Sequence, residues 1–359
     1  MFLRVSLCFT VWALLALTGC SGGEHVAPAI LSGAGAVPLD AYGAASFLRT
    51  PGEPPWIYVA NASYTAPSVT AYAKYADGNV APIATIGGSN TGLVQPMGIA
   101  VDRAGKIYVS DWFASANKYD GGPSQQGVVF VYAAGSNGNV APVATITDGL
   151  NYPYGVALDN RGNVYVGNFE GGNVTVYHSG DYKLIRTLGG SGGSYLGYVG
   201  GVAVGSTGKT YVVNTDFSGD EVSSGGGSVL VFGAHASGSN PPIQTIEGPK
   251  TGLTAPYFIA VHSSREIYVT NYADRGASEV LVFTAGATGN VKPIRVIVGS
   301  KTQLSGSGIA LDGRGSIFVA NSTSSITVYR GHARGNVAPI REISGGNTGL
   351  DRPSGIAVR

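Results

Sequence analysis

The chain has 359 residues, with 22 Lys and Arg against 21 Asp and Glu, and only 12% of its residues are charged. A nucleic-acid-binding protein would carry a clear excess of clustered basic residues, so this balance excludes nucleic acid as the partner. Because 44% of the residues are hydrophobic, the chain can bury a large core and does not belong to the disordered class. Glycine is unusually frequent, with 56 residues, but without the every-third spacing of collagen.

Residues 1–19 have the features of a signal peptide. Arg4 supplies a positive charge, and the apolar run from Val5 to Leu17 is shorter than the ~20 residues that a membrane-spanning helix needs. The run ends in Leu-Thr-Gly-Cys20, which resembles the lipobox of bacterial lipoproteins. This resemblance implies cleavage before Cys20 and lipid attachment to that cysteine. The alternative is an ordinary signal-peptidase site at which Cys20 has no role.

Residues 20–50 are predicted to form a flexible tether, because they are rich in Gly, Ala, Ser and Pro and lack a periodic apolar pattern. Removal of residues 1–19 leaves a single cysteine, so no internal disulfide can form. It also leaves equal numbers of basic and acidic residues, so lipid rather than charge would hold the protein at a membrane. We therefore expect a signal peptide at 1–19, a lipidated cysteine and tether at 20–50, and a domain at 51–359, located at a bacterial cell envelope.

From residue 51 onward, four short apolar segments, named a to d, each recur six times in the same order. Segment a resembles GIAVD and starts at Gly98, Gly155, Gly201, Phe258, Gly308 and Gly355. Segment b resembles IYVAN and starts at Ile57, Ile107, Val164, Thr210, Ile267 and Ile317. Segment c ends at Tyr72, Tyr132, Tyr177, Phe232, Phe283 and Tyr329. Segment d is the stretch typified by GNVAPIATI after Gly78.

These segments predict an all-β, six-bladed β-propeller with four antiparallel strands in each blade. The a segments start 46 to 57 residues apart, a period typical of repeat architectures. Runs rich in β-branched and aromatic residues and bounded by Gly, Asn and Pro are strands. The first complete segment is a b strand and the last is an a strand, so the C-terminal strand is expected to complete the first blade and close the ring.

The hairpin sequence PMGIAVDRAGKIYVSD, which begins at Pro96, resembles the repeats of NHL and YVTN propellers, as do its copies. Residues 268–271 read Tyr-Val-Thr-Asn, the motif that gives the second family its name. The resemblance covers about residues 51–359 and implies a propeller fold. It implies little about function, because such repeats occur in lactonases, lyases, surface-layer proteins and protein-binding scaffolds.

Loop lengths predict that one face of the propeller binds a ligand. The connection from a to b has constant length, whereas the aromatic residues of b and c are separated by 11 to 24 residues. Because adjacent strands alternate in direction, all b–c and d–a loops lie on one face, here called the variable face, and variation confined to one face is typical of a binding side. Its candidate ligand-binding residues are Asp111, Trp112, Phe113, Tyr152, Tyr154, Tyr198, Phe217, Tyr257, Tyr272 and Arg275.

The family resemblance also raises the possibility of an enzyme. Gluconolactonase-like propellers place acidic or amide metal ligands just before strand a, where this chain has Met97, Tyr154, Gly200, Tyr257, Ser307 and Ser354. None of these is a good ligand for a hard metal ion. Amidating lyases hold zinc with several histidines, but here we place only His262 in an inner strand, and His178, His235 and His332 in c–d turns.

A polar residue closes every b strand: Asn61, Asp111, Asn168, Asn214, Asn271 and Asn321. These side chains could ring the channel and bind a divalent cation, or each could satisfy nearby loop backbone groups, as such residues do in turns. We predict a monomeric, non-catalytic domain without a cofactor that binds a protein, peptide or glycan on the variable face. The alternative is a lactonase- or lyase-like enzyme with an atypical metal site built from this ring.

Overall fold

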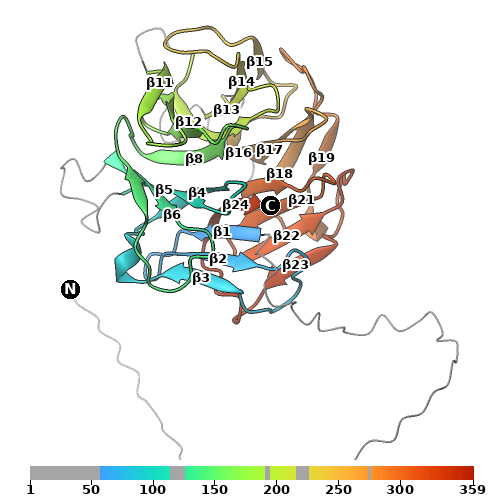
Figure 1. The fold of residues 1–359 in the computed structure, drawn as a ribbon. Coiled ribbons are helices and arrows are strands. Elements are labelled where there is room, and N and C mark those ends of the chain that lie inside the picture. Colours follow the sequence, from blue (N-terminus) through green and yellow to red (C-terminus); the bar gives the residue numbers. More distant parts are fainter. Residues whose placement is uncertain (1–56, 114–125, 191–194, 216–225, 274–275) are drawn as a thin grey trace, which may run out of the picture. The chain divides into compact units, whose positions relative to one another are not determined.

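The computed structural model describes residues 57–113, 126–190, 195–215, 226–273 and 276–359, all of which belong to the unit Arg49–Arg359. They form six four-stranded antiparallel sheets. Their innermost strands contact one another in succession and close a ring of blades (Figure 1). The predicted six-bladed all-β propeller is therefore confirmed.

The blades are numbered in chain order from β1. Blade 1 contains β24 (Pro353–Val358), β1 (Ile57–Asn61), β2 (Ser68–Tyr72) and β3 (Ala84–Gly87). Blade 2 contains β4 (Pro96–Val101), β5 (Ile107–Asp111), β6 (Val128–Tyr132) and β7 (Ala144–Ile146). Blade 3 contains β8 (Pro153–Leu158), β9 (Val164–Asn168), β10 (Asn173–Tyr177) and β11 (Leu184–Gly189).

The other three blades follow the same order, from the innermost strand to the outermost. Blade 4 contains β12 (Tyr198–Val204), β13 (Thr210–Thr215), β14 (Ser228–Phe232) and β15 (Gln244–Glu247). Blade 5 contains β16 (Ala255–Val261), β17 (Ile267–Tyr272), β18 (Ser278–Phe283) and β19 (Arg295–Ile297). Blade 6 contains β20 (Gly306–Leu311), β21 (Ile317–Asn321), β22 (Ser325–Tyr329) and β23 (Arg341–Ser344).

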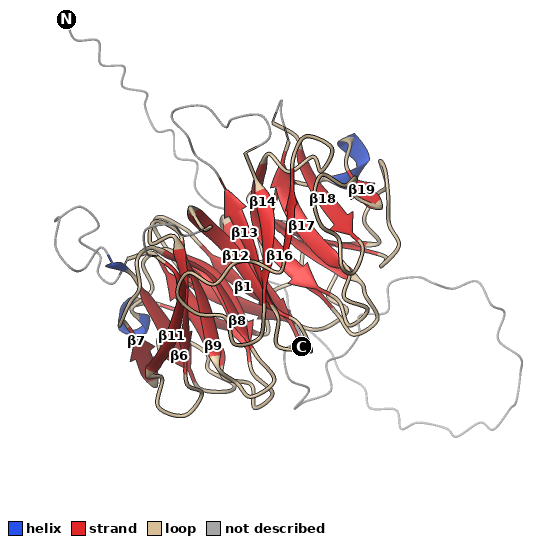
Figure 2. Ribbon diagram, turned by 90° about the horizontal axis from the view of Figure 1, so that it is seen from above, coloured by secondary structure: helices blue, strands red, loops and turns tan. Residues whose placement is uncertain are grey.

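Strands dominate the described ranges, and helix is limited to short turns such as η1 (Ser89–Thr91) and η3 (Ser300–Thr302) (Figure 2). None of the helical segments in these ranges has the length and apolar character needed to cross a membrane. The middle strands are buried along most of their length, and along all of it in β5 and β6, because each sheet packs between two other sheets. This explains why they read as continuous apolar runs rather than as alternating patterns.

The C-terminal strand closes the ring as predicted. β24 pairs antiparallel with β1, with Val358 opposite Ile57 and Ile356 opposite Val59. The two ends of the propeller sequence therefore lie side by side in blade 1 (Figure 1).

The outermost strand is shorter than segment d of the sequence. In blade 1 only residues 84–87 of the GNVAPIATI stretch form β3, and Ile83 donates its backbone N–H to Ala71 just before the strand begins. Gly78, at the start of the stretch, instead pairs with Ile343 of blade 6. The glycine that precedes each typical d strand thus contacts the neighbouring blade rather than its own.

Each innermost strand contains a β-bulge where it meets its partner. In blade 3, Pro153 pairs with Asn168 and Val156 with Val166, so Tyr154 and Gly155 together face Gly167. A Cβ atom at Gly155 would lie 2.7 Å from the backbone nitrogen of Val202 in blade 4, so this position excludes any side chain. Packing of innermost strands thus explains the glycines that start the a segments. Bulges aim side chains away from the regular strand direction. Here they place one residue of every blade at the end of the central channel that opens on the variable face, called the mouth.

Candidate functional site

The mouth on the variable face is formed by the bulge residues of the six innermost strands. They are Met97, Tyr154, Gly200, Tyr257, Ser307 and Ser354. Blade 5 differs from the others because Phe258 takes the place of the glycine and pairs with Thr270, which leaves Tyr257 alone unpaired. The mouth therefore has aromatic residues from blades 3 and 5 and serines from blades 6 and 1.

Tyr154 lies across the mouth. The residue is only 5% exposed, and the Ser307 side chain of blade 6, which is opposite blade 3 in a ring of six, lies near enough to its hydroxyl to lower its pKa slightly. The Tyr154 ring also lies 5.0 Å from the ring of Phe258, and both belong to one buried cluster with Met97. Burial raises the pKa of Tyr154 far above its ordinary value, so the hydroxyl stays protonated. Apolar and aromatic side chains from blades 2, 3 and 5 thus fill much of the mouth.

An aromatic cluster surrounds Tyr154 and joins blades 2, 3 and 4. The Trp112 ring lies 5.9 Å from the rings of Tyr152, Tyr154 and Phe169. Phe169 in turn lies 5.2 Å from Tyr198. Tilted and edge-on pairs at these separations are favourable beyond their burial of apolar area. The cluster is therefore a rigid part of the variable face rather than a set of separate loop side chains.

Phe113 completes this cluster on its blade 2 side. Its ring lies 6.1 Å from Tyr152, and the residue is buried. Phe113, Tyr152 and Tyr154 therefore act mainly as support for the rings that are more exposed. Burial also raises the pKa of Tyr257, and Tyr272 of the same blade raises it further.

Phe169 was not among the residues proposed from the sequence. It follows Asn168 at the end of β9, as Trp112 follows Asp111 and Tyr272 follows Asn271. The position immediately after the polar residue of strand b was therefore the signal that could have identified it. Phe217 and Arg275, together with Cys20, lie outside the described residues.

Exposed tyrosines border the cluster. Tyr198 is 37% exposed and Tyr272 is 45% exposed, and Tyr195 is more exposed still. A cavity of about 550 Å³ opens beside Tyr195 and Tyr198, with Asn214 and Glu247 among its lining residues. On blade 1, the guanidinium carbon of Arg352 lies 3.9 Å from the centre of the Tyr64 ring, a cation–π contact on the same face. The variable face therefore presents aromatic surface and amide or carboxylate groups together.

The polar residues that end the b strands bind loop backbone within their own blades. Asp111 accepts hydrogen bonds from the backbone of Val94 and Gln95, each at 2.8 Å. The side-chain oxygens of the asparagines accept one each from the backbone of the preceding d–a loop: Asn61 from Asp351, Asn168 from Asn151, Asn214 from Gly197, Asn271 from Thr254 and Asn321 from Ser305.

The side-chain amides of these asparagines point toward outer strands. Those of Asn61, Asn168 and Asn321 each donate at 3.0 Å to a threonine of their own blade's third strand. This is the geometry of local loop support, the second of the two interpretations given above. In the described part of the chain there is also no group of three or more His, Cys, Asp or Glu side chains placed to hold a metal ion.

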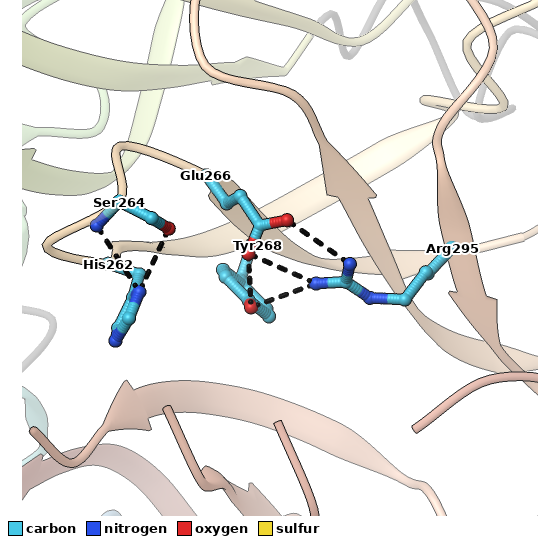
Figure 3. Close-up of polar contacts among 5 residues, drawn as sticks. All are labelled: His262, Ser264, Glu266, Tyr268 and Arg295. Atoms are coloured by element: carbon cyan, nitrogen blue, oxygen red, sulfur yellow. Dashed lines mark hydrogen bonds and ion pairs between the residues drawn. The ribbon is translucent and has the colours of Figure 1, made fainter. Parts of the chain in front are cut away.

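The polar network of blade 5 lies on the opposite face, at the turn between β16 and β17 (Figure 3). The sequence placed His262 in an inner strand, but β16 ends at Val261 and His262 begins the turn, where its Nδ1 shares a 2.9 Å hydrogen bond with Ser264. Arg295 donates to Glu266 at 3.1 Å and to the Tyr268 hydroxyl at 3.0 Å. His178, His235 and His332 lie between third and fourth strands as predicted, so these imidazoles do not converge.

No family model matches this sequence, and no curated protein matches it either. Solved structures resemble its fold. A chain of a nidogen–laminin complex is 11% identical, with a TM-score of 0.53, and the match covers 84% of this chain and 97% of that one. A protein from Bacteroides fragilis, titled as a candidate 6-phosphogluconolactonase, is 13% identical with a TM-score of 0.52, over 87% and 99% of the two chains. At such identities the likeness shows the propeller fold alone.

Proposed function

We propose that this propeller is a binding module that holds a protein, peptide or glycan on the aromatic part of its variable face, without catalysis. The observation that carries this proposal is the cluster of Trp112, Phe169 and Tyr198, packed ring on ring across three blades and bordered by exposed tyrosines. Amphipathic rings held rigidly lose little conformational entropy on binding, which makes them frequent centres of binding energy.

The shape of the surface also supports this proposal. The cavity beside Tyr198 is large enough for one or two sugar rings or a few residues of a peptide.

A lactonase- or lyase-like enzyme is the second candidate function, because the fold is shared with a protein titled as a lactonase. This candidate needs a metal ion in the channel. The buried Tyr154 and Phe258 rings occupy the mouth, and the ring of asparagines bonds to loop backbone, so the described residues fit this candidate less well.

Substitution of the exposed rings tests the binding proposal. The protein would be screened against a glycan array and a displayed peptide library, and its affinity for the best probe measured for wild type, Tyr198→Ala and Tyr272→Ala. Loss of a central aromatic contact is expected to weaken binding by about tenfold or more. Tyr75→Ala is the matched control, because Tyr75 is 56% exposed but lies between β2 and β3 on the opposite face.

Equal affinities for all four proteins would contradict the proposal, as would the absence of any binding in both screens. Hydrolysis of a lactone panel that depends on added divalent metal would favour the enzyme instead.

A further inference from the structure

Five of the six blades have the outer edge of their fourth strand covered by the next blade. A glycine from the c–d connection of that next blade forms a parallel bridge to the strand. The bridged pairs are Ile86 with Gly138, Leu188 with Gly238, Ile246 with Gly289, Ile297 with Gly335 and Ile343 with Gly78. At every junction the glycine N–H donates to the residue before the bridged Ile or Leu, at 2.6 to 2.7 Å.

The part of the c–d connection that contains the bridging glycine is here called the covering segment, and its backbone conformation and polar groups recur between junctions. Its glycines have φ values from +56° to +82°, a conformation that favours glycine. In three junctions the side chain just before the glycine caps the edge as well, because Asn137, Asp77 and Thr288 accept the outward N–H of Thr85, Glu342 and Thr245. The glycine carbonyl also accepts an N–H at the far side of the bridge, as in Gly87 to Gly138 at 3.2 Å. The outer edge of a fourth strand therefore binds a residue with a polar acceptor side chain that is followed by a glycine.

The edge of β7 in blade 2 is different. The connection of blade 3 that would cover it closes on itself, since His178 donates its backbone N–H to Lys183 and Gly180 donates to the His178 ring. Tyr182 packs edge-on against Tyr108, and Asp181 pairs with Lys183. None of these residues reaches β7 as the glycines do elsewhere.

The outward backbone groups of β7 therefore have no partner among the described residues. In the covered blades, the backbone groups at the repeat positions of Thr145 (N–H and C=O) and Thr147 (N–H) form the hydrogen bonds to the next blade. In blade 2, no hydrogen bond reaches these groups from any described residue. Thr145 is exposed, whereas its counterparts Thr85, Thr187, Thr245, Val296 and Glu342 are half-buried. Val143, next to this edge, is 61% exposed, and the equivalent isoleucines of blades 3 to 6 are exposed as well, so apolar surface beside this strand is a feature of the repeat. The fourth strand of blade 2 is thus an open strand edge with an apolar neighbour.

We propose that the outer edge of β7 is a docking site for an extended peptide segment of a partner protein, which adds to blade 2 by a parallel β-bridge. The occupant carries a polar acceptor followed by glycine opposite Ile146, because this chain itself presents that chemistry to the same edge in the other blades. Edge addition of this kind obtains affinity from main-chain hydrogen bonds. The short length of β7 limits nonspecific pairing with other strands.

A peptide copied from the chain's own covering segment is the probe. The octapeptide Gly-Ser-Asn-Gly-Asn-Val-Ala-Pro reproduces residues 135–142, which cover β3 in blade 1. Titration into the labelled protein should shift the amide resonances of Thr145 and Thr147 in a saturable way. The same peptide with N-methylglycine at the position of Gly138 lacks the N–H that Thr145 would accept, and should bind about tenfold more weakly.

Two variants separate backbone from side-chain effects. Thr147→Pro removes the outward N–H and should abolish the shifts, whereas Thr145→Ala keeps the backbone and should bind as the wild type does. Tyr198→Ala should leave peptide binding unchanged, which keeps this site distinct from the variable face. Equal binding of the N-methylated peptide, or absence of shifts at Thr145 and Thr147, would overturn the proposal. It would also be overturned if the Thr145 amide in the free protein exchanged with solvent as slowly as that of Thr85, since the edge would then already be covered.

Discussion

Glu266 shows how one side chain can join a turn to two strands. Its carboxylate contacts Arg295 of the outermost strand of blade 5 and accepts a 3.0 Å hydrogen bond from Tyr268 of the second strand. The Arg295 guanidinium holds the pKa of Glu266 below its ordinary value, and burial opposes this only in part. The folded state therefore binds this proton less tightly than the unfolded state does.

The sign of this pKa shift gives a prediction about acid stability. A lowered folded pKa stabilises the protein above the ordinary value of 4.5, and this contribution is lost as the pH falls below it. Glu266→Gln should therefore lower the free energy of unfolding at pH 7 by about 1 kcal/mol, typical of a partly exposed pair. Urea unfolding at pH 7 and at about pH 3.5 measures it, and the difference between the two proteins should shrink at the lower pH.

Glu279 supplies the control for this measurement. Burial raises its pKa, so its ionised form costs stability at neutral pH and protonation relieves that cost. Glu279→Gln should accordingly change the pH dependence in the opposite direction. A Glu266→Gln effect that stayed constant or grew as the pH fell would show that the ion pair does not contribute as described.

For single residues, the sequence predicted the residue type at each position better than the direction in which its side chain points. The polar ends of the b strands were identified, but the Asn168 amide could have pointed to the channel or to Thr175, and only the strand register decides this. The bulges were missed because a strand's own sequence does not show how many partner residues it faces. Phe258 illustrates the limit, since it occupies a repeat position where the five other blades have a buried glycine and the register shifts to accept it.

Among the elements, β24 has the largest predicted effect on stability. It buries Ile356 against blades 1 and 6 and covers the inner edge of β1. Deletion of residues 355–359 removes most of this pairing and exposes apolar surface of β1 and of the neighbouring innermost strands. We expect a loss of about 3 kcal/mol or more, seen as a strongly lowered melting temperature in circular dichroism.

Deletion of Arg359 alone is the matched control, because it removes a contact to the Arg103 carbonyl but keeps every strand pair of β24. Its melting temperature should stay close to that of the wild type. An unchanged unfolding curve for the longer deletion would refute closure by β24.

The elements themselves were predictable because each segment occurs six times. Repetition identified all four strands of a blade and the closure by the C-terminal strand. The outermost strand was predicted too long, because GNVAP is a covering segment for the preceding blade and its extended sequence resembles a strand. The c–d connection of blade 3 was not predicted to differ in its packing, and only the structure shows that it leaves β7 uncovered.

For the whole molecule, we propose attachment to the cell envelope through a lipid on Cys20. The prediction concerns partition between detergent and water. Wild-type protein from a bacterial host should enter the detergent phase on Triton X-114 separation, because two or more acyl chains anchor a protein stably. Cys20→Ser should move the protein to the aqueous phase without changing its melting temperature. Recovery of both proteins in the aqueous phase would exclude the lipid anchor.

The variable face is uneven around the ring. Aromatic rings pack against one another on blades 2 to 5, whereas blade 6 presents serines such as Ser305 and Ser322 and blade 1 presents the Arg352–Tyr64 pair. Function on a near-symmetric scaffold therefore depends on departures from the repeat rather than on the repeat itself. The open edge of β7 is another such departure, on a different part of the surface.

The pairing of β24 with β1 also has a consequence for biosynthesis. β1 is the first strand of the propeller to be translated and β24 is its last, so the ring stays open until β24 has been made. Blades 2 to 6 can form in order from local contacts, but blade 1 must wait with an uncovered edge. Ring closure is thus coupled to synthesis of β24, and a chain stalled before this strand would expose the edge of β1 to chaperones or to other nascent chains.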